Sequence, residues 1–238
     1  MGTVTWVGGD GTGDEQTDSS RAGNWSGGVP GSGDEVVIPN TTHECRLVTS
    51  YTWGSLEIET SGEIDGNGKT ITLDDGGVAA VFSNLGTITG ILDIKCNGAT
   101  GRNIYEAGAG SIRNLEIDRA GQEFTLTFHT TLDGDLTITA GELDTGADWN
   151  LTVTGKTTIG EAAAAPSANT AVLDCNASAC SFGSLLTANY GLQIQTGGTF
   201  TGGTGDHTMG SFCMDNNHAD CRATLSSGDT TINSEKSS

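Results

Sequence analysis

Hydrophobic and polar positions alternate in short Leu-x-Ile segments that recur along most of this 238-residue chain. Copies begin at residues 56, 71, 92, 115, 136, 151 and 192, so successive copies start 15, 21, 23, 21, 15 and 41 residues apart. The last interval accommodates a weaker copy at Val172-Leu173 or Leu185-Leu186. Because alternate side chains of a strand point to opposite faces, each copy places two apolar side chains on one face. The pattern predicts a series of short β-strands.

Strands this short cannot each bury an apolar face alone, but they can when they stack in parallel as a solenoid. Gly accounts for 37 residues and Pro for 3, and Gly supplies the left-handed backbone that tight corners require. No segment shows the period of an amphipathic helix, and the run Ala162 to Ala165 before Pro166 is interpreted as a loop. We therefore predict an all-β fold, a right-handed parallel β-helix. Strands 56–58, 92–94, 115–117 and 136–138 are expected to stack in register, with residues 57, 93, 116 and 137 facing outward.

The chain is predicted to have three parts. Residues 1–40 are rich in Gly and contain Trp6 and Trp25, and we interpret them as an N-terminal cap, because the open end of a solenoid must be covered. Both indoles are expected to be buried there. Residues 41–203 form the β-helix body. Residues 204–238, where the repeat weakens into a polar sequence, are predicted to be a C-terminal cap and tail.

The net charge of −20 comes from 30 acidic and 10 basic residues. Such a surface repels nucleic acid and anionic membranes, and it attracts cations such as Ca²⁺. No apolar stretch is long enough for a transmembrane helix. We therefore expect neither nucleic acid nor membrane among the partners.

The six cysteines allow three interpretations: free thiols, disulfides, or a metal site. The close pairs Cys175/Cys180 and Cys213/Cys221 would form disulfides in an oxidising medium. A Zn²⁺ site would take its soft and borderline ligands from four residues near the C-terminus: His207, Cys213, His218 and Cys221. Their spacing matches no standard zinc finger, so no cofactor is predicted beyond these Zn²⁺ and Ca²⁺ alternatives.

Catalysis would require paired carboxylates with a neighbouring acid or base, as in polysaccharide-degrading β-helices. The candidates are Asp74-Asp75, Asp93, Glu116 and Asp118, with Arg113 and Arg119 nearby. Asp93 and Glu116 are expected on outward faces, and seven Trp and Tyr residues in total give little material for a long sugar-stacking groove. We therefore predict a protein that is not an enzyme and has no catalytic residues, with lyase or hydrolase activity as the alternative.

The segments Thr5-Trp6-Val7-Gly8-Gly9, Ala22 to Pro30 and Asp34 to Pro39, followed by the Leu-x-Ile repeats, resemble β-helical bacteriophage virion proteins and autotransporter-like adhesins. The resemblance covers residues 3–203. It implies a structural, capsid-decorating or fibre component of a virion, assembled in the host cytoplasm with other virion proteins and then exposed outside the cell. It also implies contact with a host-surface glycan.

Two alternatives stay open: a glycan-binding adhesin on a bacterial cell surface, and a polysaccharide-degrading tailspike. Met1 to Trp6 lack an ordinary secretory signal, which favours the virion. Virion fibres of this kind commonly form trimers, so we expect a homo-oligomer. An apolar ridge at Phe124, Leu126 and Phe128 would supply its interface if it faced outward.

Overall fold

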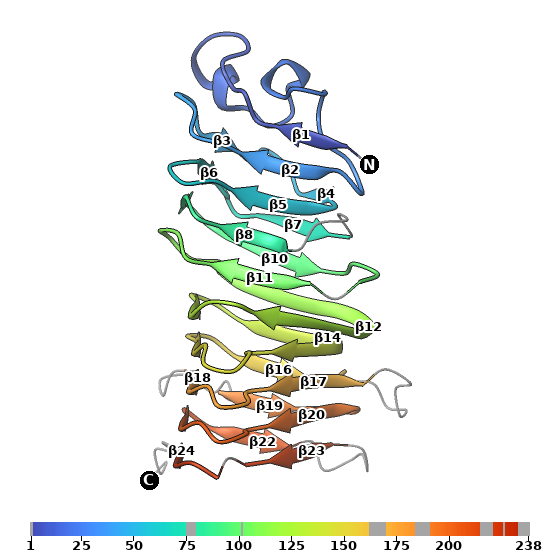
Figure 1. Cartoon of the computed structure of the whole chain (residues 1–238), viewed down its shortest axis with the longest axis vertical. Coiled ribbons are helices and arrows are strands. Elements are labelled where there is room, and N and C mark those ends of the chain that lie inside the picture. Colours follow the sequence, from blue (N-terminus) through green and yellow to red (C-terminus); the bar gives the residue numbers. More distant parts are fainter. Residues whose placement is uncertain are drawn as a thin grey trace. The chain divides into compact units, whose positions relative to one another are not determined.

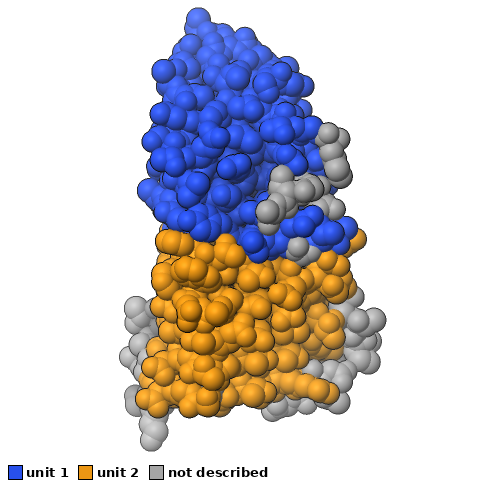
Figure 2. Space-filling view, viewed as in Figure 1, with its two compact units in different colours: residues 1–113 blue, residues 114–238 orange. Residues whose placement is uncertain are grey.

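The computed structural model of the chain describes residues 2–74, 80–100, 102–161, 170–183, 191–214, 221–225 and 227–232. These residues form parallel β-strands and two short 3-10 helices, η1 (Gly13–Thr17) and η2 (Ala22–Asn24) (Figure 1). The chain divides into two compact units, residues 1–113 and 114–238 (Figure 2). Within the described ranges, no helix combines the length and the apolar character that crossing a membrane requires. The all-β prediction is confirmed.

Unit 1, residues 1–113, is a parallel β-solenoid with three stacks of strands. One stack contains β1 (Thr3–Thr5), β2 (Glu35–Ile38), β5 (Ser55–Ile58), β8 (Ala80–Asn84) and β11 (Asn103–Glu106). A second contains β3 (Cys45–Arg46), β6 (Glu63–Asp65) and β9 (Thr87–Thr89). The third contains β4 (Tyr51–Trp53), β7 (Lys69–Leu73) and β10 (Leu92–Cys96). Each full coil therefore contributes one strand to every stack.

Unit 2, residues 114–238, repeats this plan. The first stack contains β12 (Asn114–Leu126), β14 (Leu136–Asp144), β16 (Thr157–Ile159), β19 (Leu192–Ile194) and β22 (Phe212–Met214). The carboxyl-terminal halves of β12 and β14 continue into a second stack with β17 (Ala171–Asp174), β20 (Gly198–Thr201) and β23 (Arg222–Thr224). The third contains β13 (Thr130–Leu132), β15 (Leu151–Val153), β18 (Cys180–Phe182), β21 (His207–Met209) and β24 (Thr230–Ile232).

Strand β14 serves two stacks because it turns a corner at Gly141, where φ is +89°. A Cβ atom at this position would lie 2.3 Å from the carbonyl oxygen of Arg119 in the neighbouring coil. Only glycine fits both this backbone conformation and this close approach. The corner fixes the direction of the strand end that carries Glu142 and Asp144.

Every predicted Leu-x-Ile copy is a strand, and its Leu, Ile or Val side chains are buried. In unit 2, Leu115 pairs with Leu136 and Ile117 with Ile138, as predicted. The single stack expected for residues 56–58 and 92–94 is wrong, because β5 pairs with β2 and β8 whereas β10 pairs with β7. The physical reason is that each coil holds three strands. An interval of 15 residues therefore leads to another face of the same coil, and an interval of 21 leads to the next coil.

The structure also places the two N-terminal tryptophans, the weaker strand copy and the expected apolar ridge. Trp6 and Trp25 are buried, as predicted. Val172-Leu173 lies in β17 and is the weaker strand copy, whereas Leu185-Leu186, the alanine run and residues 233–238 lie outside the described residues. Phe124 and Leu126 are fully buried, so they form no apolar ridge, and the predicted trimer loses that support.

Candidate functional site

A four-residue corner recurs in three successive coils of unit 2. Its copies are Leu143 to Gly146, Leu173 to Asn176 and Phe200 to Gly203. The last residue of each copy has a left-handed backbone, with φ of +68°, +43° and +62°. Gly and Asn are the residues that tolerate this conformation best. The corner therefore places aligned side chains on alternating sides: Asp144, Asp174 and Thr201 outward, and Thr145, Cys175 and Gly202 inward.

The outward side of these corners is hollowed into a groove of about 540 Å³. Its floor and walls come from the three aligned corners: Asp144, Gly146, Ala147, Asp174, Asn176, Ala177, Thr201, Gly203 and Thr204. The Asn176 side-chain amide donates to Asp144 Oδ1 at 2.5 Å, and the Asn176 backbone N–H donates to Asp174 Oδ1 at 3.0 Å. Within the described part of the chain, these carboxylates use no Oδ2 atom in a hydrogen bond. The groove therefore offers free acceptors.

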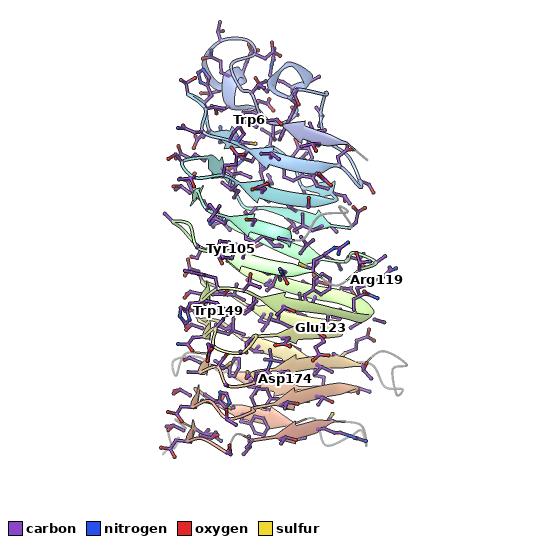
Figure 3. The ribbon with its side chains drawn as sticks, viewed as in Figure 1. Trp6, Tyr105, Arg119, Glu123, Trp149 and Asp174 are labelled. Carbon is purple, nitrogen blue, oxygen red and sulfur yellow. The ribbon has the colours of Figure 1, made fainter. Side chains whose placement is uncertain are left out.

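A cluster of three rings lies beside the groove. The Trp149 indole is stacked on Phe128, with ring centroids 5.7 Å apart and an interplanar angle of 23°, and His129 meets Trp149 edge-on at 5.3 Å. Trp149 and Phe128 are half-buried and His129 is exposed. Gly146, which lines the groove, connects the two features, because a Cβ there would be 3.0 Å from Trp149 Cδ1. Figure 3 labels Trp149 and Asp174 in this unit.

Carboxylates also stack along the neighbouring part of this face. Glu123 is paired with Glu142, and Asp144 with Asp174, so like charges stand directly opposite each other in adjacent coils. Partial burial, followed by the charges of Glu123, Asp174 and Asp144, raises the pKa of Glu142. The surface around the groove is therefore strongly negative and would repel an anionic ligand.

The inward side of the same corners holds a second feature, a buried group of Cys175, Cys180 and His207. Their ligand atoms all lie within 4.8 Å of one another, and each residue is at most 2% exposed. The two Sγ atoms are 2.6 Å apart. His207 Nε2 donates to the carbonyl oxygen of Gly202, and the backbone N–H of Cys180 donates to His207 Nδ1 at 3.3 Å. Sulfur and imidazole nitrogen are ligands that suit Zn²⁺ and related ions.

The titration of these groups is linked. The neighbouring Cys175 thiol stabilises the thiolate form of Cys180, with a smaller contribution from His207, and lowers the Cys180 pKa. Burial raises the pKa of Cys175. Burial also opposes a charge on His207, but the Cys180 sulfur and the Gly202 carbonyl outweigh it and raise the His207 pKa. By contrast, burial alone raises the pKa of Cys96 to about 12, as expected of a core thiol.

The zinc set predicted from the sequence is only partly assembled. His207 belongs to the buried group, but its companions are Cys175 and Cys180, and Cys213 and Cys221 are not members. His218 lies outside the described residues. Spacing along the chain favoured Cys213 and Cys221 as the cysteines nearest to His207. The solenoid instead brings together residues one coil apart, since Cys180 pairs with His207 across β18 and β21.

The acids considered for catalysis occupy separate local structures. Asp93 forms a bidentate ion pair with Arg113, at 2.9 and 2.5 Å. Asp118 accepts a hydrogen bond from the Thr139 hydroxyl at 2.8 Å, and Asp74 accepts from Ser32 and Gly33. Glu116 faces outward, half-buried, and Arg119 is exposed, while Asp75 lies outside the described residues. Asp144 and Asp174, which line the groove described above, were not singled out from the sequence.

In comparisons with known proteins, the chain matches no family model, no curated protein and no solved structure.

Proposed function

We propose that this chain is a surface module that binds a neutral carbohydrate in the groove of unit 2. The observation that carries the proposal is the half-exposed Trp149–Phe128 stack beside the groove, whose walls include two aligned carboxylates. A large aromatic pair left partly in water, in a chain with only 4 Trp, has lost part of the burial free energy available to it. Contact with a ligand would recover that free energy.

The chemistry of the groove favours a sugar over other ligands. A sugar ring presents C–H groups that pack against an aromatic face, and hydroxyl groups that donate to carboxylate oxygens. Asp144 and Asp174 supply such acceptors, and Thr201 adds a hydroxyl. The volume of about 540 Å³ is in the range of small-molecule sites, and the groove spans three coils, as an oligosaccharide would need.

The charge of the molecule further limits which sugars could bind in the groove. With a net charge of −20 and carboxylates in the groove, uronic and sialic acids would be repelled. A neutral glycan escapes this penalty. Ca²⁺ bridging Asp144 and Asp174 would be the route by which an acidic glycan could still bind.

We propose further that the module serves as a fibre or decoration component of a bacteriophage virion, in contact with other virion proteins and with a host-surface glycan. The support is the likeness of residues 3–203 to such proteins, together with the solenoid itself. Within this proposal the chain forms a homo-oligomer, a trimer, and a bacterial cell-surface setting is the alternative. A reading frame placed among capsid and tail genes would support the virion, and one placed among secretion genes would favour the adhesin.

The binding test is a glycan array with the wild-type protein, followed by calorimetric titration with the best neutral oligosaccharide. Trp149→Ala and Asp174→Asn should each weaken binding at least about tenfold, a loss of about 1.4 kcal/mol. Tyr105→Ala, an outward aromatic of β11 in unit 1, is the matched control and should bind normally.

Two results would overturn the proposal. One is binding that is unchanged in both groove variants, and the other is the absence of any neutral ligand on the array. Release of reducing ends from a bound polysaccharide would instead assign the chain to the polysaccharide-degrading class.

A further inference from the structure

The buried side of the three corners contrasts with the rest of the solenoid interior. Inward positions of unit 2 are mostly Leu, Ile, Val and Phe, but here Thr145, Cys175, Cys180 and His207 come together with almost no exposure. A His side chain placed in such a core loses its contact with water and must find partners. Gly202 creates the space for it, since this aligned inward position has no side chain.

We propose that Cys175, Cys180 and His207 bind a zinc ion, as a structural site that ties three segments of unit 2 together. The donor set is two thiolates and one imidazole, which suits Zn²⁺. Cys175 and Cys180 are separated by four residues, within the range for paired ligands, and His207 is supplied by the next coil.

The orientation of His207 supports this assignment. Its Nε2–H is committed to the Gly202 carbonyl oxygen, so Nδ1 is the acceptor, and its lone pair accepts the backbone N–H of Cys180 at 3.3 Å. That N–H also donates to the Asp206 carbonyl oxygen at 3.2 Å, so it would keep a partner if the Nδ1 lone pair bound a metal ion. A backbone carbonyl that holds one ring nitrogen as a donor is the usual second partner of a metal-binding histidine.

A second observation comes from Thr145, which aligns with Cys175 because Asp144 pairs with Asp174. The Thr145 side chain is 0% exposed, and its hydroxyl has no hydrogen-bond partner within the described residues. A buried hydroxyl without a partner costs about 1–3 kcal/mol. It would be satisfied as the fourth ligand, or by a water molecule in that position.

The distance between the two sulfur atoms leaves a disulfide as the alternative to a bound metal ion. At 2.6 Å, the two Sγ atoms lie between the ~2.05 Å of a disulfide and the ~3.8 Å that two thiolates take on a tetrahedral ion with Zn–S bonds of ~2.3 Å. A disulfide would leave His207 and Thr145 unexplained, whereas a metal ion engages all four residues. Binding requires both thiols to lose their protons to solvent, so affinity should rise with pH.

The test is a titration of the reduced, chelator-treated full chain with Co²⁺ as a spectroscopic substitute. We expect the visible bands of tetrahedral cobalt and a near-ultraviolet thiolate-to-cobalt band, saturating at about one ion per chain. Zn²⁺ should bleach these bands and raise the melting temperature. Cys175→Ser, a change of a single atom, should abolish the thiolate band, and Cys213→Ser should leave it unchanged.

Circular dichroism of Cys175→Ser separates loss of the site from loss of the fold. The proposal is overturned if the reduced wild-type protein gives no thiolate band, or if the band persists in Cys175→Ser. It is also overturned if reduced protein binds no ion and mass spectrometry finds a Cys175–Cys180 disulfide. These results are independent of glycan binding, which uses the outward side of the corners.

Discussion

The two units use their tryptophans in opposite ways. Unit 1 buries Trp6, Trp25 and Trp53 in a cluster, in which Trp25 meets both neighbours edge-on at centroid distances of 4.9 and 5.9 Å. The indole N–H groups of Trp6 and Trp25 donate to backbone carbonyl oxygens at 2.8 Å. Unit 2 leaves its Trp149 half in solvent, stacked on Phe128 beside a groove.

Under the proposed function, this difference separates stability from recognition within one type of fold. A buried, hydrogen-bonded indole contributes to the core, and its removal leaves a cavity. A half-exposed indole contributes less to folding but keeps a face available for a ligand. The role of a tryptophan in this fold therefore depends on whether its position in the coil buries the indole or leaves it partly in solvent.

The largest expected effect is on stability, in Trp25→Ala. Loss of the indole removes two edge-on ring contacts and the hydrogen bond to the Ser19 carbonyl oxygen. We expect the free energy of unfolding to fall by about 3 kcal/mol or more. Urea denaturation followed by circular dichroism measures this, and a loss below about 1 kcal/mol would contradict the structural role of the cluster.

Trp149→Ala should show the reverse pattern. The free energy of unfolding should change by less than about 1 kcal/mol, because the side chain is only half-buried. Affinity for the neutral oligosaccharide should fall at least about tenfold. Denaturation and calorimetric titration of the same preparation give both values, and a large destabilisation without loss of binding would remove the distinction between the two units.

The smallest effect concerns the acidic face of unit 2. The pKa of Glu142 is raised in the folded state, so the native protein holds this proton more tightly than the unfolded chain does. Protonation of Glu142 therefore stabilises the folded protein at pH values below the pKa of the unfolded chain. This stabilisation is lost as the pH rises through the pKa of the folded state.

Glu142→Gln should therefore stabilise the protein slightly at pH 7, by about 0.5 kcal/mol or less because the group is partly solvated. The gain should vanish near pH 4. Melting curves at both pH values test this, with Glu57→Gln, an exposed outward acid of β5 in unit 1, as the control. A gain that is equal at the two pH values would indicate a cause other than charge.

The sequence predicted the strands because the Leu-x-Ile copies show both the two-residue period of a strand and the face of it that is buried. It predicted the pairing of residues 115–117 with 136–138, but it did not separate the stacks of unit 1, since the 15-residue and 21-residue intervals look alike until three strands per coil are known. Leu56–Ile58 and Leu92–Ile94 were placed in one stack for this reason, although they belong to different ones.

The candidate sites were harder to predict, because their residues meet only through coil stacking. Cys180 and His207 are 27 positions apart and are neighbours in register. Asp144 and Asp174 likewise are far apart in the sequence and are neighbours in register. A signal was present in the aligned corners Leu143-Asp144-Thr145-Gly146 and Leu173-Asp174-Cys175-Asn176, whose third residues are polar or a thiol where a core would place an apolar side chain.

The most direct test of the contrast between the two units is fluorine NMR of protein labelled with 5-fluorotryptophan, with the Trp149 resonance assigned from Trp149→Phe. The account predicts that this resonance alone has a clear H₂O/D₂O isotope shift and moves on titration with a neutral oligosaccharide. The resonances of Trp6, Trp25 and Trp53 should stay in place. An unmoved Trp149 signal under saturating ligand, or a shift confined to the three buried indoles, would contradict it.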